Sequence, residues 1–241
     1  MQSRVARLDR FISVRTGINR KHVRLMLAQG RVQVDGVPAT DIQQPVGEFS
    51  RVLLDGEVLQ ANTPRYVMLH KPVGVVSATR DTLHKTVIDL LECPDADTLH
   101  IVGRLDLNSS GLLLLTNDGR WSRELTSPQS KVSKQYRVTL ANPIGEDYVA
   151  AFAGGMYFAY EDITTRPAGL RILSERVAEV TLVEGRYHQI KRMFGRFRNP
   201  VLALHRHAIG NLALDPNLEP GQSRELTCQE VRSIAGKVPA N

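Results

Sequence analysis

Short runs of β-forming residues alternate irregularly with helical segments from Tyr66 to the end of the chain, and this alternation restricts the fold more than any other feature. Because the order is irregular, it favours an α+β domain. We expect a mostly antiparallel mixed sheet that is flanked by helices. The expected strands are 66–69, 99–102, 112–116, 135–140, 177–183 and 201–204, and the expected helices are 86–92, 119–126, 146–153, 188–197 and 228–235.

The first 59 residues show a different pattern, in which two short helices precede two hairpins. Asn19 is a suitable N-cap for the second helix, and Gly17 and Gly30 are suitable stops. The stretches "VQVDGVPA" and "VLLDGEVL" each carry the Asp-Gly signal of a β-hairpin. This segment therefore predicts two helices packed on a small sheet. The apolar residues at helical spacing are Leu8, Phe11, Ile12, Val23, Met26 and Leu27.

Positive charge is concentrated at the start of the chain. Residues 1–31 contain eight Lys or Arg against one acid, whereas the whole chain has a net charge of +6. Arg20, Lys21 and Arg24 share one face of the second expected helix, while its apolar residues turn inward. A solvated basic face is the plain interpretation of such a run, but this concentration in a folded segment favours contact with phosphates.

The polar stretch "QANTPR", residues 60–65, precedes a new apolar run and is the best candidate for a linker. We therefore expect an N-terminal domain over 1–59, a linker over 60–65 and a larger domain over 66–241. The larger domain is the one that carries the candidate chemistry.

Several classes of protein do not fit this sequence. Cys93 and Cys228 match no CxxC pattern, which argues against a disulfide framework or a zinc site and fits a reducing cytoplasm. The longest strongly apolar run, 112–115, is too short to span a bilayer. The histidines His188, His205 and His207 have no carboxylate among them, so we expect them to be surface or phosphate-facing residues rather than metal ligands. The nucleotide-binding and GxSxG motifs are absent.

Three stretches of the larger domain carry polar residues that could act chemically, although each has a plain structural interpretation. Asp106 lies in the polar loop of "GRLDLNSSGLLLLTNDG", where an aspartate often serves a local turn. Tyr136 in "SKQYRVTL" shares a strand face with Val138 and Lys134, as a core tyrosine would. The basic stretch "EGRYHQIKRMFGRFRNPVLALHRH" by itself indicates only a surface that binds anions.

Taken together and in this order, "HKPVGVVSAT", "GRLDLNSSGLLLLTNDG", "SKQYRVTL" and "EGRYHQIKRMF" behind a basic domain resemble the bacterial pseudouridine synthases of the RsuA type. The N-terminal segment resembles the small RNA-binding domain named after ribosomal protein S4. The resemblance covers residues 4 to about 235. It implies that the enzyme isomerises uridine in RNA to pseudouridine. The target base leaves the RNA stack, and the reaction uses one carboxylate without a cofactor or metal.

The resemblance also implies roles for individual residues. Asp106 matches the essential aspartate, which acts either as a nucleophile at C1′ of the ribose or as the base that removes its C2′ proton. Tyr136 matches the tyrosine that stacks on the target base, and Lys191 matches the basic residue that pairs with Asp106 in a dry pocket. Ile190 matches the apolar wall of the uracil site. Arg104 matches the arginine that fills the gap left by the flipped uridine.

The stretch "DGRWSRELTSP" resembles the branch of the family that modifies one uridine of small-subunit (16S) rRNA, which implies uridine 516 as target. The expected partner is this rRNA or a partly assembled ribosomal subunit, which Arg20, Lys21 and Arg24 would help to bind. We expect a cytoplasmic monomer without a membrane partner. Two alternatives remain: the same chemistry on 23S rRNA, and a non-catalytic rRNA-binding or assembly protein.

Overall fold

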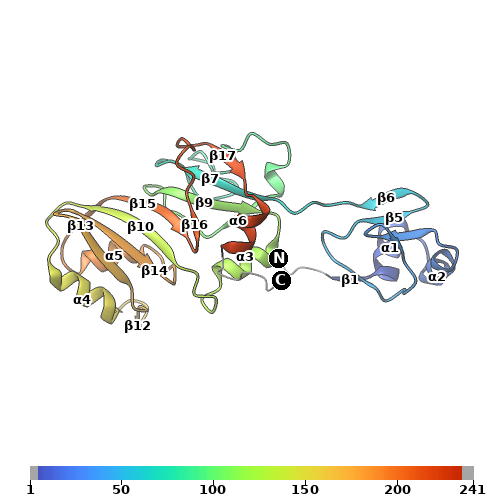
Figure 1. Ribbon diagram of the computed structural model, residues 1–241, viewed down its shortest axis with the longest axis horizontal. Coiled ribbons are helices and arrows are strands. Elements are labelled where there is room, and N and C mark those ends of the chain that lie inside the picture. Colours follow the sequence, from blue (N-terminus) through green and yellow to red (C-terminus); the bar gives the residue numbers. More distant parts are fainter. Residues whose placement is uncertain (1–4, 235–241) are drawn as a thin grey trace. The chain divides into compact units, whose positions relative to one another are not determined.

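The computed structural model describes residues 5–234 of the chain. The chain divides into two compact units, one up to Pro64 and the other from Arg65 onwards (Figure 1). Each unit buries an apolar core of its own.

The N-terminal unit combines two helices with a four-stranded antiparallel sheet in the order β3-β2-β5-β6. The Asn19 side chain accepts a hydrogen bond from the Lys21 N–H at 2.9 Å, and Gly17 ends the first helix in the left-handed conformation. These caps confirm the predicted helix limits. The elements are β1 (Ala6–Arg7), α1 (Leu8–Thr16), α2 (Arg20–Ala28), β2 (Val32–Val34), β3 (Val37–Pro38), β4 (Pro45–Val46), β5 (Val52–Leu54) and β6 (Glu57–Gln60).

Both predicted Asp-Gly turns connect strands of this sheet. Asp35 and Gly36 have φ angles of 54° and 83°, and Asp55 and Gly56 have φ angles of 52° and 86°. Positive φ at both central residues matches the twist of antiparallel strands, and Gly and Asp tolerate it. The turns therefore join β2 to β3 and β5 to β6, as predicted.

Helix α2 separates apolar and basic residues on two faces. Val23 and Leu27 are buried in the core of the unit. Arg20, Lys21 and Arg24 are exposed. The helix therefore presents three cations to solvent while its apolar side chains stabilise the unit.

The C-terminal unit is built on a nine-stranded sheet with the path β13-β14-β10-β15-β9-β7-β17, with β16 beside β15 and β8 beside β9. Only β15 and β9 are parallel among these paired strands, so the predicted mostly antiparallel mixed sheet is confirmed. The strands are β7 (Tyr66–Lys71), β8 (His100–Val102), β9 (Ser110–Thr116), β10 (Lys134–Leu140), β13 (Gly169–Ser174), β14 (Val177–Leu182), β15 (Val201–Ile209), β16 (Leu212–Ala213) and β17 (Ser223–Glu225).

Helices cover both faces of this sheet. The described helices are a 3-10 turn η1 (Ala96–Thr98), α3 (Gly119–Thr126), α4 (Glu146–Gly154), α5 (Gln189–Gly195) and α6 (Cys228–Ser233), and a small ribbon joins β11 (Tyr157–Phe158) to β12 (Ile163–Thr164). Figure 1 shows α4 and α5 beside the β13–β10 end of the sheet and α3 and α6 beside the β9 region.

The four leucines of β9 explain its central position in the sheet. Leu113 and Leu115 join the apolar cluster that includes residues of α4 and α5, whereas Leu112 and Leu114 join the cluster that includes residues of α3. Successive side chains of a strand point to opposite faces, so an unbroken apolar run requires both faces to be covered. The strand is held between β7 and β15, and the loop before it is positioned by this rigid support.

Gly111 makes the parallel contact between β9 and β15 possible. It pairs with Arg206 and has a φ of 110°. A Cβ atom at this position would lie 2.2 Å from the Arg206 carbonyl oxygen. Only glycine therefore allows the two backbones to approach where the polar loop joins β9.

The structure corrects parts of the predicted element list. The expected helix over 86–92 is absent, and this segment forms turns. Strand β13 was not predicted. The helices expected over 119–126 and 146–153 are confirmed as α3 and α4. The helix expected over 188–197 is present as the shorter α5 (Gln189–Gly195). The helix expected over 228–235 is confirmed over 228–233, and residue 235 of its predicted range lies outside the described residues.

Among residues 5–234, none of the helices has the length and apolar character that crossing a membrane requires.

Candidate active site

The loop that carries Asp106 is anchored on both sides of this residue. Leu105 is buried, and its backbone N–H and carbonyl are both bound by the Ser77 hydroxyl, at 3.1 and 2.7 Å. The Asp106 carbonyl accepts a hydrogen bond from the Ser109 N–H at 3.0 Å, which closes a local turn. The plain interpretation of the loop as a turn is therefore correct for its backbone, and the Asp106 side chain remains available for other contacts.

Lys71 also supports the loop that carries Asp106. Its side chain is fully buried, and Nζ donates to the carbonyls of Pro72, Asp106 and Ser109 at 2.9, 3.1 and 2.8 Å. Burial lowers the pKa of Lys71 to about 8, although the negative charge of Asp106 acts in the opposite direction. The loop is thus fixed by a buried ammonium group at the end of β7.

A second braced loop leads into α5. The buried Glu184 carboxylate accepts hydrogen bonds from the Gln189 side chain at 2.7 Å and from the Arg166 N–H at 2.9 Å. Gln189 in turn accepts from the Arg186 N–H at 3.1 Å. His188 begins the helix with a φ of 49°, a conformation that is unusual for a residue with a side chain. These bonds fix the direction in which His188 and Lys191 extend.

The two loops meet at the Asp106 carboxylate. Lys191 Nζ lies 3.4 Å from Asp106 Oδ2, and His188 Nε2 lies 3.5 Å from the same oxygen. The expected pair of Asp106 and Lys191 is therefore present. The expected dry surroundings are not, because the Asp106 side chain is 32% exposed. The carboxylate lies at the wall of an open cleft, between two nitrogen-bearing groups.

Tyr136 extends from β10 toward this cleft. Its side chain is 7% exposed, and it stands opposite Arg206 of β15 in the sheet. The register between β10 and β15 shifts between Gln135 and Tyr136. Irregularities of this kind redirect side chains beside active sites. The guanidinium carbon of Arg206 lies 6.0 Å from the centre of the Tyr136 ring.

A cavity of about 450 Å³ joins these groups. Its lining includes five of the residues that the sequence resemblance predicts, namely Arg104, Asp106, Tyr136, Ile190 and Lys191. Arg104 is exposed, whereas Ile190 is buried and contributes an apolar wall. The volume falls within the range of small-ligand sites. The predicted cleft residues are thus brought together from three separate segments of the chain.

The charge of this cleft favours an anionic ligand. Its two carboxylates, Asp106 and Glu184, both have cationic partners. Lys134 and Arg206 also line the cavity, and burial lowers the pKa of Lys134. Arg206 is fully buried, donates to the carbonyls of Leu112 and Arg104, and leaves Nη2 without a hydrogen-bond partner among the described residues. Cations therefore outnumber acids around the cavity, as a polyanionic substrate requires.

The predicted residues Arg20, Lys21 and Arg24 belong to the N-terminal unit. Their exposure on α2 leaves all three free to contact phosphates.

Two residues that line the cleft, and Lys71 behind the Asp106 loop, were missed or misinterpreted from the sequence. His188 contacts Asp106 and is not simply a surface or phosphate-facing histidine. Lys71 lies in the quoted "HKPVGVVSAT" stretch, but only the fold shows that it holds the Asp106 loop. Arg206 lies in the basic stretch that ends in His-Arg-His, and nothing in this stretch distinguishes a buried arginine from an exposed one. The described residues contain no cluster of ligands for a metal ion.

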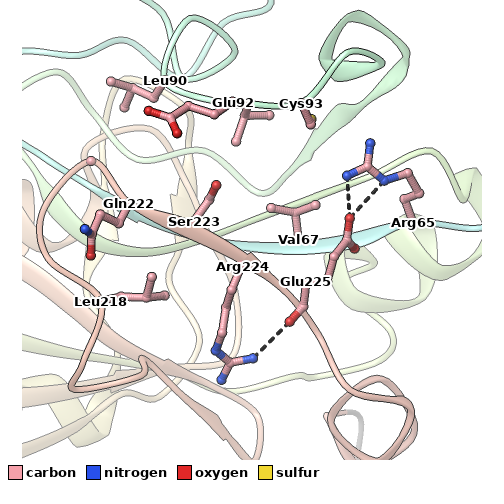
Figure 2. A pocket seen from close by; sticks show the side chains of 12 residues that line it. Arg65, Val67, Leu90, Glu92, Cys93, Leu218, Gln222, Ser223, Arg224 and Glu225 are labelled. Carbon is pink, nitrogen blue, oxygen red and sulfur yellow. Dashed lines mark hydrogen bonds and ion pairs between the residues drawn. The ribbon is translucent and has the colours of Figure 1, made fainter.

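A second cavity of about 560 Å³ lies at the edge of the sheet, beside β7 and β17 (Figure 2). Its arginines are occupied, since Arg65 pairs with Glu225, and Arg224 pairs with Glu230 at 2.7 Å. None of the predicted site residues is among its lining. The smaller cleft, which holds the polar groups that converge on Asp106, is therefore the better candidate for catalysis.

Comparisons with known proteins agree with this geometry. The family model described as RNA pseudouridylate synthase matches residues 65–195, and the S4 domain model matches residues 6–52. A solved structure, described as the crystal structure of pseudouridylate synthase, superimposes with a TM-score of 0.70 at 38% identity and covers 95% of this chain and 99% of that chain.

Named relatives match this chain over nearly its whole length. "Ribosomal small subunit pseudouridine synthase A" of Pseudomonas aeruginosa is 51% identical over 95% of this chain and 100% of its own. The proteins of the same name from Vibrio cholerae and Escherichia coli are 43% and 41% identical, each over 95% of this chain and 99% of their own. These matches show that the chain is a pseudouridine synthase and belongs to the RsuA-type family, with an S4 domain ahead of the catalytic domain.

Proposed function

We propose that this enzyme converts one uridine of small-subunit rRNA to pseudouridine, and that the target is uridine 516 of 16S rRNA. The single observation that supports the catalytic assignment best is the contact of Asp106 with Lys191 inside a cationic cleft. The names of the relatives, which span nearly the whole chain, support the small ribosomal subunit as the source of the substrate. We also propose that the enzyme acts in the cytoplasm as a monomer.

The reaction exchanges one bond of the nucleoside for another. The bond between C1′ of the ribose and N1 of uracil breaks, the base turns, and a bond forms between C1′ and C5. The C5 proton leaves and N1 gains a proton, so that substrate and product are isomers. No oxidant, reductant or external group donor is needed.

Asp106 acts on the ribose in this reaction. Its carboxylate either attacks C1′ and holds the sugar until C5 replaces N1, or removes the C2′ proton as the C1′–N1 bond breaks and returns it to C2′ when the C1′–C5 bond forms. In both routes the carboxylate must be ionised and aimed at the sugar. Lys191 and His188 contact the carboxylate and hold it in place, and Lys71 fixes the backbone that aims it.

The remaining cleft residues hold the extruded nucleotide. A uridine that is stacked in RNA cannot turn about its glycosidic bond, so it must leave the stack. Tyr136 supplies an aromatic face for the base and Ile190 supplies an apolar wall. Arg104, which is exposed at the cleft, occupies the gap in the RNA. Arg20, Lys21 and Arg24 bind backbone phosphates and so increase affinity without a role in the chemical step.

The test replaces Asp106 with asparagine, which keeps the size and polarity of the side chain but removes its charge. We expect Asp106→Asn to fold and to bind rRNA but to release no tritium from rRNA labelled at C5 of uridine. Activity that survives in this variant would refute the role of Asp106. A parent enzyme that binds rRNA and forms no pseudouridine would instead favour the non-catalytic assembly protein.

The target position is tested separately. Carbodiimide treatment and reverse transcription of rRNA from a deletion strain should lose one stop, at uridine 516 of 16S rRNA. A stop that disappears from 23S rRNA would assign the enzyme to the large subunit instead.

A further inference from the structure

Tyr187 is a large aromatic residue that the fold leaves exposed at the mouth of the catalytic cleft. Its side chain is 75% exposed, although it lines the same cavity as Asp106. It makes no contribution to the apolar clusters of the unit. Its position is therefore not explained by packing of the core.

The ring is nevertheless held in one place. It stacks on the His188 ring with a centroid separation of 3.9 Å and an interplanar angle of 19°. The Tyr187 carbonyl accepts a hydrogen bond from Arg192 at 3.5 Å, and the left-handed backbone of His188 directs the two rings. Because an unusual backbone conformation costs free energy, it persists where neighbouring contacts determine it. The two rings therefore form a stacked pair in which each ring supports the other.

The surroundings of this pair match single-stranded RNA. Arg186 and Lys191 line the cavity on either side of it in the sequence. Exposed aromatic rings beside cations are the usual platform on which unpaired bases stack, since the rings accept the base and the cations accept the phosphates. A fixed ring also loses little conformational freedom when it binds.

We propose that Tyr187 and His188 form a stacking platform for a nucleotide that flanks the target uridine. This inference rests on the proposed function and adds a second base-binding position to it. Tyr136 is buried and receives the flipped base, whereas Tyr187 is exposed at the mouth of the cleft, where the RNA strand enters. His188 also contacts Asp106. A base that stacks on Tyr187 is therefore separated by the Tyr187 ring alone from His188, which contacts the catalytic carboxylate.

Steady-state kinetics on a naked small-subunit rRNA transcript test the platform. A flanking contact is made in the ground state and in the transition state alike, so its loss raises KM and leaves kcat nearly unchanged. From the free energy of stacking, we expect Tyr187→Ala to raise KM roughly five- to 100-fold. Tyr187→Phe and Tyr187→Trp should remain within about threefold of the parent, because stacking requires the ring and not the hydroxyl.

Tyr160 provides a matched control, since it is 96% exposed and does not line the cleft. Tyr160→Ala should keep the parent KM. A parent KM in Tyr187→Ala would overturn the platform, and so would a Phe variant as weak as the Ala variant. A lower kcat at saturating RNA, with KM unchanged, would place Tyr187 on the target base and would also contradict the proposal.

A binding measurement separates this inference from the proposed function. In Tyr187→Trp, naked transcript should quench the emission of the new indole, whereas in Tyr160→Trp it should not. Quenching that is equal in the two variants, or absent from both, would overturn the platform even if the parent is active. A parent that forms no pseudouridine while Tyr187→Trp alone is quenched would refute the proposed function and leave the platform in place.

Discussion

Lys191 Nζ lies 3.4 Å from Asp106 Oδ2, although the two residues belong to a helix and to a loop that are distant in the sequence. The contact depends on two independent supports. Glu184 and Gln189 brace the segment before α5, and Lys71 binds the loop of Asp106. The ion pair is therefore a consequence of the fold, and each partner can be tested by substitution.

Loss of the ammonium group at position 191 should reduce turnover more than RNA binding. We expect Lys191→Met to lower kcat roughly 10- to 100-fold, because the carboxylate loses the ion pair that positions it and a misplaced catalytic group can cost about 100-fold in rate. Lys191→Arg retains the positive charge and should recover most of this loss. Tritium release at saturating rRNA measures both variants. Equal losses in the two variants would show that charge at this position is not what matters.

The buried Lys71 predicts a dependence of stability on alkaline pH. Burial lowers its pKa from 10.5 to about 8, so between these values the unfolded chain binds more protons at this residue than the folded chain does. The free energy of unfolding that is due to Lys71 therefore rises as the pH increases from about 8 to 10.5. Denaturant titrations of the parent and of Lys71→Met should show this rise in their difference. A difference that stays constant over this interval would contradict the lowered pKa.

Gly111 predicts a sharp intolerance to substitution. A Cβ atom there would meet the Arg206 backbone, so Gly111→Ala must separate β9 from β15 and should cost more than about 4 kcal/mol. Gly154 at the end of α4 has open space around its Cβ position and is the matched control. Thermal unfolding should show a large loss for Gly111→Ala and none for Gly154→Ala. A mild effect at position 111 would mean that the two strands can separate easily.

Local signals in the sequence were sufficient for some elements. The Asp-Gly turns determine both hairpins because their backbone conformation is intrinsic to the dipeptide. The expected helix over 86–92 does not form, although Thr86 and Asp89 bind each other's backbone N–H groups at 3.2 and 2.8 Å, as residues at a helix N-terminus do. Val87 is buried in the core, so the tertiary contacts favour the turn over the helix.

Strand β13 was missed because it lies at the edge of the sheet. Leu170 and Ile172 alternate with exposed residues, but this alternation is short and the exposed Leu173 interrupts it, so the sequence signal for a strand is weak. In the cleft, the family resemblance implied that Asp106 and Lys191 would meet. It did not predict the support from Lys71 or the contact with His188, because both depend on how separate segments approach in space.

The exposed cations of α2 predict a salt-dependent contribution to RNA affinity. Each phosphate contact releases condensed counterions, so a double substitution Arg20→Ala and Arg24→Ala should reduce the slope of log affinity against log salt by about 1.5. Turnover at saturating rRNA should stay at the parent value, because contacts with backbone phosphates contribute to affinity and not to the chemical step.

Arg171 offers a control for this measurement, since it is an exposed arginine of the C-terminal unit that pairs with Glu179 at 2.9 Å. Arg171→Ala should leave the salt slope unchanged. Binding of rRNA to filters over a range of salt concentrations gives the three slopes. If the double variant kept the parent slope, a face other than α2 would contact the phosphates. If it lost turnover at saturating rRNA, the N-terminal unit would take part in placing the uridine and not only in affinity.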